Sequence, residues 1–280
     1  MTATAAARLE FELHQTFRYR YAGPVARVDQ RLVVVPPPRH GGQVRRSHQL
    51  SVVGATAEAN WSRDPFANSV ARVRVPEVDG QVEFHIHAII ERDPLGETKV
   101  PAAARSDPRY LLATRLTTPD DAISAAANDA ASGAASIADA AERLCLQVHR
   151  RLHYRKGATS VFTTAAEALA IGAGVCQDHA HLMLAMCRSL GIPARYVSGH
   201  MLGEGSTHAW VEVIFANPQD ERSAVAVAFD PCHGRRVDHS YVVVAVGRDY
   251  LDVAPVSGTY FGHHANELSS STHLTVRHLG

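Results

Sequence analysis

Hydrophobic and polar positions alternate with period two through most of the first third of the chain. Such alternation is typical of strands with one buried face, because successive side chains point to opposite sides of a sheet. Turns rich in glycine and proline separate the runs. The runs are Leu9–Phe17, Arg31–Val35, Gln49–Val53, Val70–Val75 and Val82–Ile90. The pattern predicts an antiparallel, sandwich-like β domain over residues 1–95.

The pattern changes after a proline-containing segment. Pro94, Pro101, Pro108 and Pro119 punctuate the chain there, which indicates a connector over residues 96–120. Apolar residues then recur every third or fourth position within 136–152, the spacing of a helix buried on one face.

Two more helices are expected, followed by strands. Thr164 and Glu167 have the spacing of a capping box and predict a short helix, and a third helix begins at Cys176 and ends before Gly191. Strand-like runs follow at 194–201, 208–215, 224–230 and 241–246. We therefore expect an α+β protein whose second domain, residues 121–280, packs helices on an antiparallel sheet.

Composition narrows the classes of function. The 280 residues are 46% hydrophobic and 20% charged, enough to bury a sizeable core. Lys and Arg number 28, as do Asp and Glu, so the chain has no net positive charge to attract nucleic acid or an anionic membrane. No run approaches the length of a membrane span, and no leader is visible at Met1, so we expect a cytoplasmic protein. Four unevenly spaced cysteines indicate free thiols.

Cys176 is the candidate nucleophile. Gly172 and Gly174 precede it and allow a tight turn into the helix that Cys176 begins. A helix N-terminus offers unpaired N–H groups and a partial positive charge, which favour a thiolate. A nearby imidazolium strengthens that effect, so the hypothesis requires a histidine.

His208 and Asp230 are candidates for the base and for the residue that orients it. His208 opens one alternating run and Asp230 closes the next. A hairpin centred on Gln219 would place the two residues directly opposite each other. The aspartate would fix the imidazole tautomer and leave the other ring nitrogen for the thiol, as in cysteine hydrolases.

A series of motifs resembles the bacterial transglutaminase-like proteins of the papain-like superfamily. The motifs are Gly174-Val-Cys-Gln-Asp178, the segment from Cys187 to Gly199, His208-Ala-Trp-Val-Glu-Val213, Phe229-Asp-Pro231 and Val244 to Tyr250. The resemblance implies a papain-like fold with a Cys-His-Asp catalytic triad at Cys176, His208 and Asp230, and an N-terminal β-rich domain. Two positions depart from the family pattern: His179 replaces an aromatic residue, and Cys232-His233 replaces Thr-Asn.

Three further residues have weaker site roles. Gln177 is a candidate for binding the oxyanion, beside the backbone N–H of Cys176. Trp210 shares a strand face with His208, so it is expected to shield the imidazole, line an acyl pocket or pack in the core. His179 is a candidate for the substrate pocket and for altering the nucleophile.

No metal and no cofactor are expected. Cys176, His179, His208, Cys232 and His233 are the candidate ligands for zinc. Cys176 and His179 have the spacing of a weak half-site, but no second short-spaced pair completes a tetrahedral set. The acidic pair at 120–121 lacks a calcium loop. Arginines and histidines of the β domain, such as those at 45–46 and 85–87, are interpreted as solvated strand faces.

The sequence predicts cysteine-dependent cleavage of peptide or isopeptide-like amide bonds through a thioester. Transglutaminase-type transfer of the acyl group to an amine is the alternative, and a catalytically silent peptide-binding module is the second alternative. The expected partner is a peptide or protein amide, with an amine acceptor in the alternative. Oligomeric state and natural substrate stay open.

Overall fold

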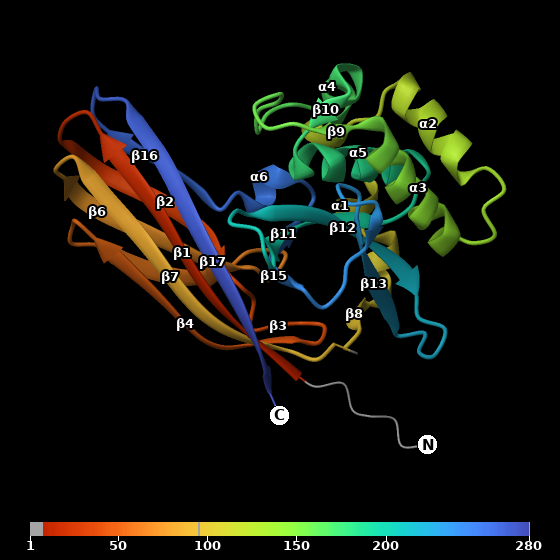
Figure 1. Ribbon diagram of the computed structural model, residues 1–280, viewed down its shortest axis with the longest axis horizontal. Coiled ribbons are helices and arrows are strands. Elements are labelled where there is room, and N and C mark those ends of the chain that lie inside the picture. The colour runs from red at the N-terminus through yellow and green to blue at the C-terminus, as the bar shows by residue number, and fades with distance from the viewer. Residues whose placement is uncertain (1–7, 95, 280) are drawn as a thin grey trace.

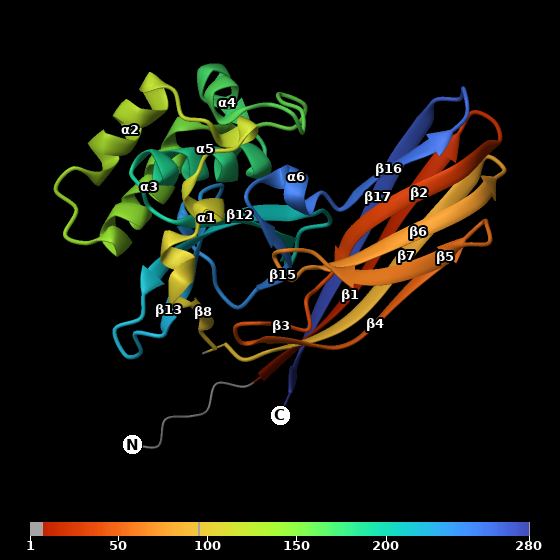
Figure 2. The ribbon, with the colours of Figure 1, turned by 180° about the vertical axis from the view of Figure 1, so that it is seen from behind.

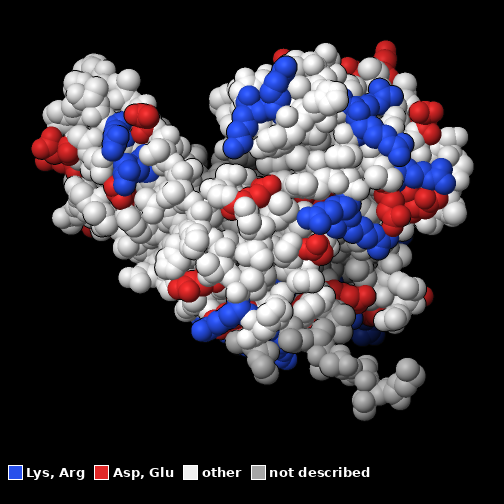
Figure 3. Space-filling view, viewed as in Figure 1, with Lys and Arg blue, Asp and Glu red and all other residues white. Residues whose placement is uncertain are grey.

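The computed structural model describes residues 8–94 and 96–279, and these form a β-sheet lobe beside a lobe of helices and sheet (Figure 1). The fold class expected from the sequence is confirmed. Figure 3 shows a notch between the two lobes at the top of the view. Positive and negative side chains are scattered over the face of the molecule seen there. Within the described residues, no helix has the length and apolar character needed to cross a membrane.

The β lobe consists of two antiparallel sheets. One has the order β17-β1-β7-β4-β3 and the other β16-β2-β6-β5. Its early strands are β1 (Arg8–Tyr21), β2 (Val25–Val35), β3 (Arg39–His40), β4 (Gln43–Val53), β5 (Glu58–Arg63), β6 (Ser69–Val78) and β7 (Gln81–Arg92). Alternate residues of β1 are buried, as the period-two pattern predicts. The β5 strand is exposed along its whole length, so it lacks the pattern that reveals the others.

The second lobe packs helices on a sheet of order β14-β13-β12-β11-β15, with β8 added beside β13. Its strands are β8 (Thr98–Pro101), β9 (His153–Tyr154), β10 (Ala173–Gly174), β11 (Ala194–Met201), β12 (His208–Ala216), β13 (Ser223–Asp230), β14 (Arg235–Arg236) and β15 (Tyr241–Gly247). Its helices are η1 (Ala102–Ser106), α1 (Pro108–Leu111), η2 (Arg115–Thr117), α2 (Asp121–Ala131), α3 (Ile137–Arg151), α4 (Ala165–Ile171), α5 (Cys176–Ser189) and α6 (Tyr250–Val253). The central α5 helix contacts β11, β12 and the helices α2, α3 and α4.

The last strands of the chain lie in the β lobe and not in the second domain, to which the sequence analysis assigned residues 121–280. Strands β16 (Val256–Phe261) and β17 (Asn266–Leu279) fall in the range assigned to the catalytic domain. They pair instead with β2 and β1 of the β lobe (Figure 2). Both strands are largely exposed, so they lack the alternation of hydrophobic and polar residues that marks a strand with one buried face. The connector 96–120 is also structured, since its β8 strand pairs with β13.

Candidate active site

Cys176 begins α5 because of the residues around it. Gly172 ends α4 in the left-handed conformation, with φ of +68°. Gly174 is needed for space, because a Cβ there would lie 2.5 Å from Oδ2 of Asp178. That oxygen accepts hydrogen bonds from the Val175 N–H at 2.7 Å and the Thr159 hydroxyl at 2.6 Å. The glycines and Asp178 together present Cys176, a half-buried free thiol, at the helix N-terminus.

The β12–β13 hairpin brings His208 to Asp230, but not in the expected register. Val211 faces Phe229 and Ala216 faces Ala224, so the hairpin is centred on Asp220 rather than Gln219. His208 is therefore diagonal to Asp230 instead of directly opposite. The displacement keeps both side chains on one face of the sheet, since side chains alternate with period two. Nε2 of His208 lies 2.7 Å from Oδ2 of Asp230.

The Cys176 thiol lies near enough to His208 to influence the pKa of the imidazole. Burial of the ring lowers the pKa of His208, but the hydrogen bond with Asp230 and the influence of Asp230 and Cys176 outweigh burial and raise that pKa. Asp230 shows the converse: burial raises its pKa, while its hydrogen bonds, chiefly with His208, hold the pKa well below the ordinary range. The structure thus places the candidate base and orienting residue in direct contact, with the candidate nucleophile near the base.

The Asp230 carboxylate has more hydrogen-bond partners than the sequence indicated. Its Oδ1 accepts from the backbone N–H groups of Cys232 at 2.9 Å and His233 at 3.2 Å. Its Oδ2 also accepts from the Tyr241 hydroxyl at 2.7 Å and lies 2.8 Å from Nδ1 of His233. The carboxylate is fully buried, so these contacts compensate for the loss of water.

Sequence reasoning missed two residues of the site, Tyr241 and Glu204. It noted His233 as a departure from the family pattern next to Asp230 but assigned it no contact with that carboxylate. Tyr241 begins β15, and no local pattern links it to Asp230. Oε2 of Glu204 lies 3.4 Å from Nδ1 of His208, and Glu204 sits in the loop before β12.

Trp210 is a core residue that shields the imidazole. It is fully buried, and its ring lies 6.2 Å from the His208 ring at 29°. Its other neighbour is Tyr241, which meets it edge to face at 5.4 Å. Gly199 makes room for the indole, because a Cβ there would lie 2.5 Å from that ring.

Gln177 and His179 use their side chains for structure. The Gln177 amide donates to the Val161 carbonyl at 3.2 Å and thus anchors the loop before α4. His179 is 1% exposed, and its ring nitrogens lie 2.9 Å from the Val175 carbonyl and 3.1 Å from the Leu152 carbonyl. Burial lowers the pKa of His179 more than these bonds raise it. The histidine fastens the end of α3 to the start of α5 and does not line a pocket.

The ligand set at this site is small. His208, Asp230 and His233 bring one ligand atom each to within 4.8 Å of one another. Cys176, His179 and Cys232 are not part of that group. The close contacts are hydrogen bonds to a single carboxylate, as the proposed orienting role requires.

Comparison with known proteins identifies both lobes. The profile of the transglutaminase-like superfamily core matches residues 124–231, and that of the bacterial transglutaminase-like N-terminal region matches residues 11–91. The crystal structure of a candidate cysteine protease from Cytophaga hutchinsonii superposes with a TM-score of 0.75 at 20% identity, covering 98% of this chain and 92% of that one. At this identity the likeness shows the fold.

Mycobacterial relatives extend the match. Uncharacterized proteins of Mycobacterium bovis and Mycobacterium tuberculosis are each 30% identical over 250 residues, covering 79% of this chain and 78% of theirs. An uncharacterized protein of Mycobacterium leprae is 38% identical over 135 residues, which span 45% of this chain and 46% of that protein. The chain belongs to the transglutaminase-like superfamily and carries the bacterial transglutaminase-like N-terminal region.

Proposed function

We propose that the protein cleaves peptide or isopeptide-like amide bonds with Cys176 as the nucleophile. The observation that carries the proposal is the 2.7 Å contact between the buried His208 ring and the buried Asp230 carboxylate, with the half-buried Cys176 thiol near enough to His208 to influence the pKa of the ring. A thiol at a helix N-terminus beside an imidazole is the arrangement that makes thiolates at neutral pH.

The reaction follows from these positions. Sγ of Cys176 attacks the amide carbonyl carbon, and its proton passes to His208. The N–H groups at the start of α5, including that of Cys176, stabilise the oxyanion. His208 then donates the proton to the leaving nitrogen, the C–N bond breaks and a thioester remains. Water, deprotonated by His208, attacks the thioester, and release of the acid restores the thiol.

Asp230 orients His208 throughout. Its bond to Nε2 leaves Nδ1 as the nitrogen available to the thiol. The same thioester reacts with an amine in the alternative function, acyl transfer, so the two functions differ in the acceptor and not in the first step.

The first test is the pH dependence of iodoacetamide alkylation, located by peptide mapping. We expect Cys176 to be labelled below neutral pH in wild type and to lose this reactivity in His208→Ala. The other thiols give a low background, because burial raises the pKa of Cys145 and Cys187 to about 12 and also raises that of Cys232. Cys232→Ala is the matched control and should leave the labelling of Cys176 intact.

The second test separates the functions. Amide substrates are incubated with and without a primary amine, and the products are identified by mass spectrometry. Free acid formed in both conditions supports hydrolysis, whereas the amine adduct as main product supports acyl transfer. If Cys176 reacts only at the pH of an ordinary thiol and Cys176→Ala matches wild type in every assay, the proposal fails and the silent binding module replaces it.

A further inference from the structure

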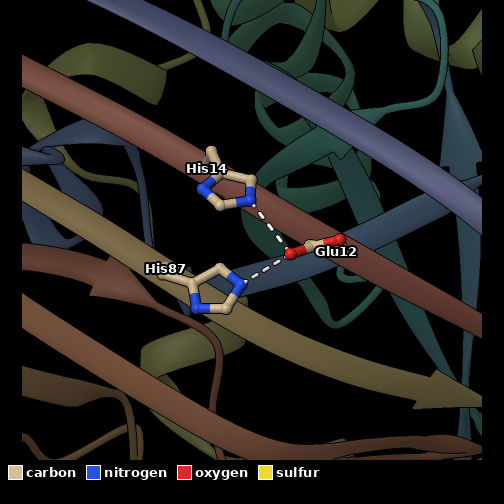
Figure 4. A group of neighbouring side chains, drawn as sticks. All are labelled: Glu12, His14 and His87. Atoms are coloured by element: carbon tan, nitrogen blue, oxygen red, sulfur yellow. Dashed lines mark hydrogen bonds and ion pairs between the residues drawn. The ribbon is translucent and has the colours of Figure 1, made fainter.

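Glu12, His14 and His87 form a cluster on the β lobe, far along the chain from Cys176 (Figure 4). One oxygen, Oε1 of Glu12, lies 3.1 Å from Nε2 of His14 and 2.9 Å from Nε2 of His87. The two imidazole rings are stacked, with centroids 4.4 Å apart. We propose that this cluster is a binding site for a first-row divalent cation, with zinc as the preferred ion.

The sheet holds the three side chains in place. Glu12 and His14 are two residues apart on β1 and therefore share a face. His87 is the direct partner of His14 across the antiparallel β1–β7 pair. The neighbouring residues Leu13 and Ala88 are fully buried, so all three ligands point to the opposite, outer face. Ligands on paired strands are more rigidly positioned than ligands on loops.

The ligand atoms fit the coordination chemistry of zinc. Imidazole nitrogen and carboxylate oxygen bind zinc at about 2.0 to 2.2 Å, which separates tetrahedral neighbours by about 3.4 Å. The three ligand atoms lie within 4.8 Å of one another. The two nitrogen–oxygen distances, 3.1 and 2.9 Å, are slightly shorter than the tetrahedral separation of about 3.4 Å. A small opening of the cluster admits the ion. Binding uses the Nε2 lone pairs, so each ring keeps its proton on Nδ1.

The site is accessible and has room for further ligands. The side chains of Glu12, His14 and His87 are 47%, 54% and 37% exposed. A third histidine, His273, is the register partner of His14 on β17. His273 faces outward as well, because the adjacent Leu274 is buried with Leu13. Imidazoles therefore follow one another across β7, β1 and β17, and water completes the coordination.

The test combines a binding titration with a footprint in the full chain. Isothermal titration with ZnCl2 is performed on wild type, Glu12→Gln, His14→Ala and His87→Ala. We expect each variant to bind at least about tenfold more weakly, since even outer-sphere partners change metal affinity by about 10 to 100-fold. His85→Ala is the matched control, because His85 lies on the same strand and face as His87, but its Nε2 lies 2.7 Å from Glu83 and His85 is not in the cluster.

The footprint locates the ion without any substitution. Diethyl pyrocarbonate modifies accessible histidines, and the modified peptides are mapped by mass spectrometry with and without ZnCl2. We expect zinc to protect His14 and His87 but not His85. This distinguishes the site from His208, Asp230 and His233, which also bring ligand atoms together. The proposal is overturned if His14 and His87 are modified equally with zinc, or if all three variants bind zinc as wild type does.

Discussion

His233 is the residue at which this site departs most clearly from the Pro-Thr-Asn-Gly pattern of the family. Nδ1 of His233 lies 2.8 Å from Oδ2 of Asp230, and Nε2 of His208 lies 2.7 Å from the same oxygen. The His233 side chain is 36% exposed, whereas that of His208 is 2% exposed. The partly exposed His233 imidazole therefore contacts the same Asp230 carboxylate that contacts the buried His208 imidazole.

Replacing His233 by asparagine is expected to alter the titration of His208. Burial raises the pKa of Asp230, but hydrogen bonds from His208, Tyr241 and His233 outweigh burial and lower that pKa. Loss of the His233 bond leaves the carboxylate more basic, so it holds the His208 proton more tightly. We predict that the midpoint of His208 in a ¹⁵N-histidine NMR titration rises by up to about one pH unit.

His263→Asn, at an exposed position, is the control and should leave that midpoint unchanged. An unchanged midpoint in His233→Asn would limit His233 to a structural contact with the turn after β13.

Among the elements, β15 shows how the lobes are joined. It is the last strand of its sheet, and its edge is covered by two amide side chains of the β lobe. Gln43 donates to the Val243 carbonyl at 2.8 Å and accepts from the Val243 N–H at 2.9 Å. Asn68 does the same with Val246, at 2.7 and 2.9 Å. These side chains replace a neighbouring strand and satisfy an edge that would otherwise be unpaired.

Glu212 on β12 is a second junction. Its carboxylate lies 2.7 Å from Nε2 of His40 on β3 and accepts a bond of 2.7 Å from Nε of Arg195 on β11. We predict that Glu212→Gln lowers the free energy of unfolding by about 3–5 kcal/mol, because the buried Arg195 charge is left unpaired. Urea denaturation measures this change. Glu142→Gln, which breaks the exposed pair with Arg236, should cost less than about 1 kcal/mol.

The same ion pair makes stability depend on pH. Burial raises the pKa of Glu212, but Arg195 and His40 outweigh burial and lower it to about 2. The unfolded carboxyl titrates near about 4.3. The contribution of Glu212 is therefore complete above that value and is lost as the pH falls toward 2. Wild type should lose more stability than Glu212→Gln over this range, and parallel pH profiles would contradict the assignment.

At the scale of the whole molecule, the C-terminal strands complete the β lobe. The N-terminal family region matches residues 11–91, yet both sheets of this lobe include strands from beyond residue 255. Figure 1 shows β17 lying along β1. Leu274 of β17 packs with Phe11 and Leu13 of β1 and with Val242 of β15. One small cluster thus joins β17, the rest of the β lobe and the second lobe.

Leu274→Ala is predicted to destabilise both lobes together, by about 2–5 kcal/mol. The two tryptophans allow a test, because Trp61 lies on β5 of the β lobe and Trp210 on β12 of the second lobe. In a Trp61→Phe background, tryptophan fluorescence reports the second lobe alone. We expect the urea midpoint of Trp210 to fall in Leu274→Ala.

Thr275→Ala is the neighbouring control, since Thr275 is exposed and adjacent on the same strand. A Trp210 midpoint that is unaffected by Leu274→Ala would show that the lobes unfold independently, despite the contacts of Gln43, Asn68 and Glu212.

Local patterns in the sequence determined much of this protein. Period-two alternation predicted the strands with one buried face, and the glycines before Cys176 predicted a helix that starts at the thiol. The motif series identified the family, which the profile matches confirm. These features were readable because neighbours along the chain fix turns, caps and the buried face of an element.

Tertiary structure decided what depends on residues far apart in the sequence. The predicted register of the β12–β13 hairpin was wrong by two residues, because the loop residues did not specify the turn. Tyr241 on β15 reaches Asp230 on β13 although β12 and β11 lie between these strands in the sheet. Strand β17 pairs with β1 across more than two hundred residues. The approach of Glu12 and His14 to His87 likewise depends on strand pairing. Such contacts form only when the whole chain closes its cores, so no local pattern encodes them.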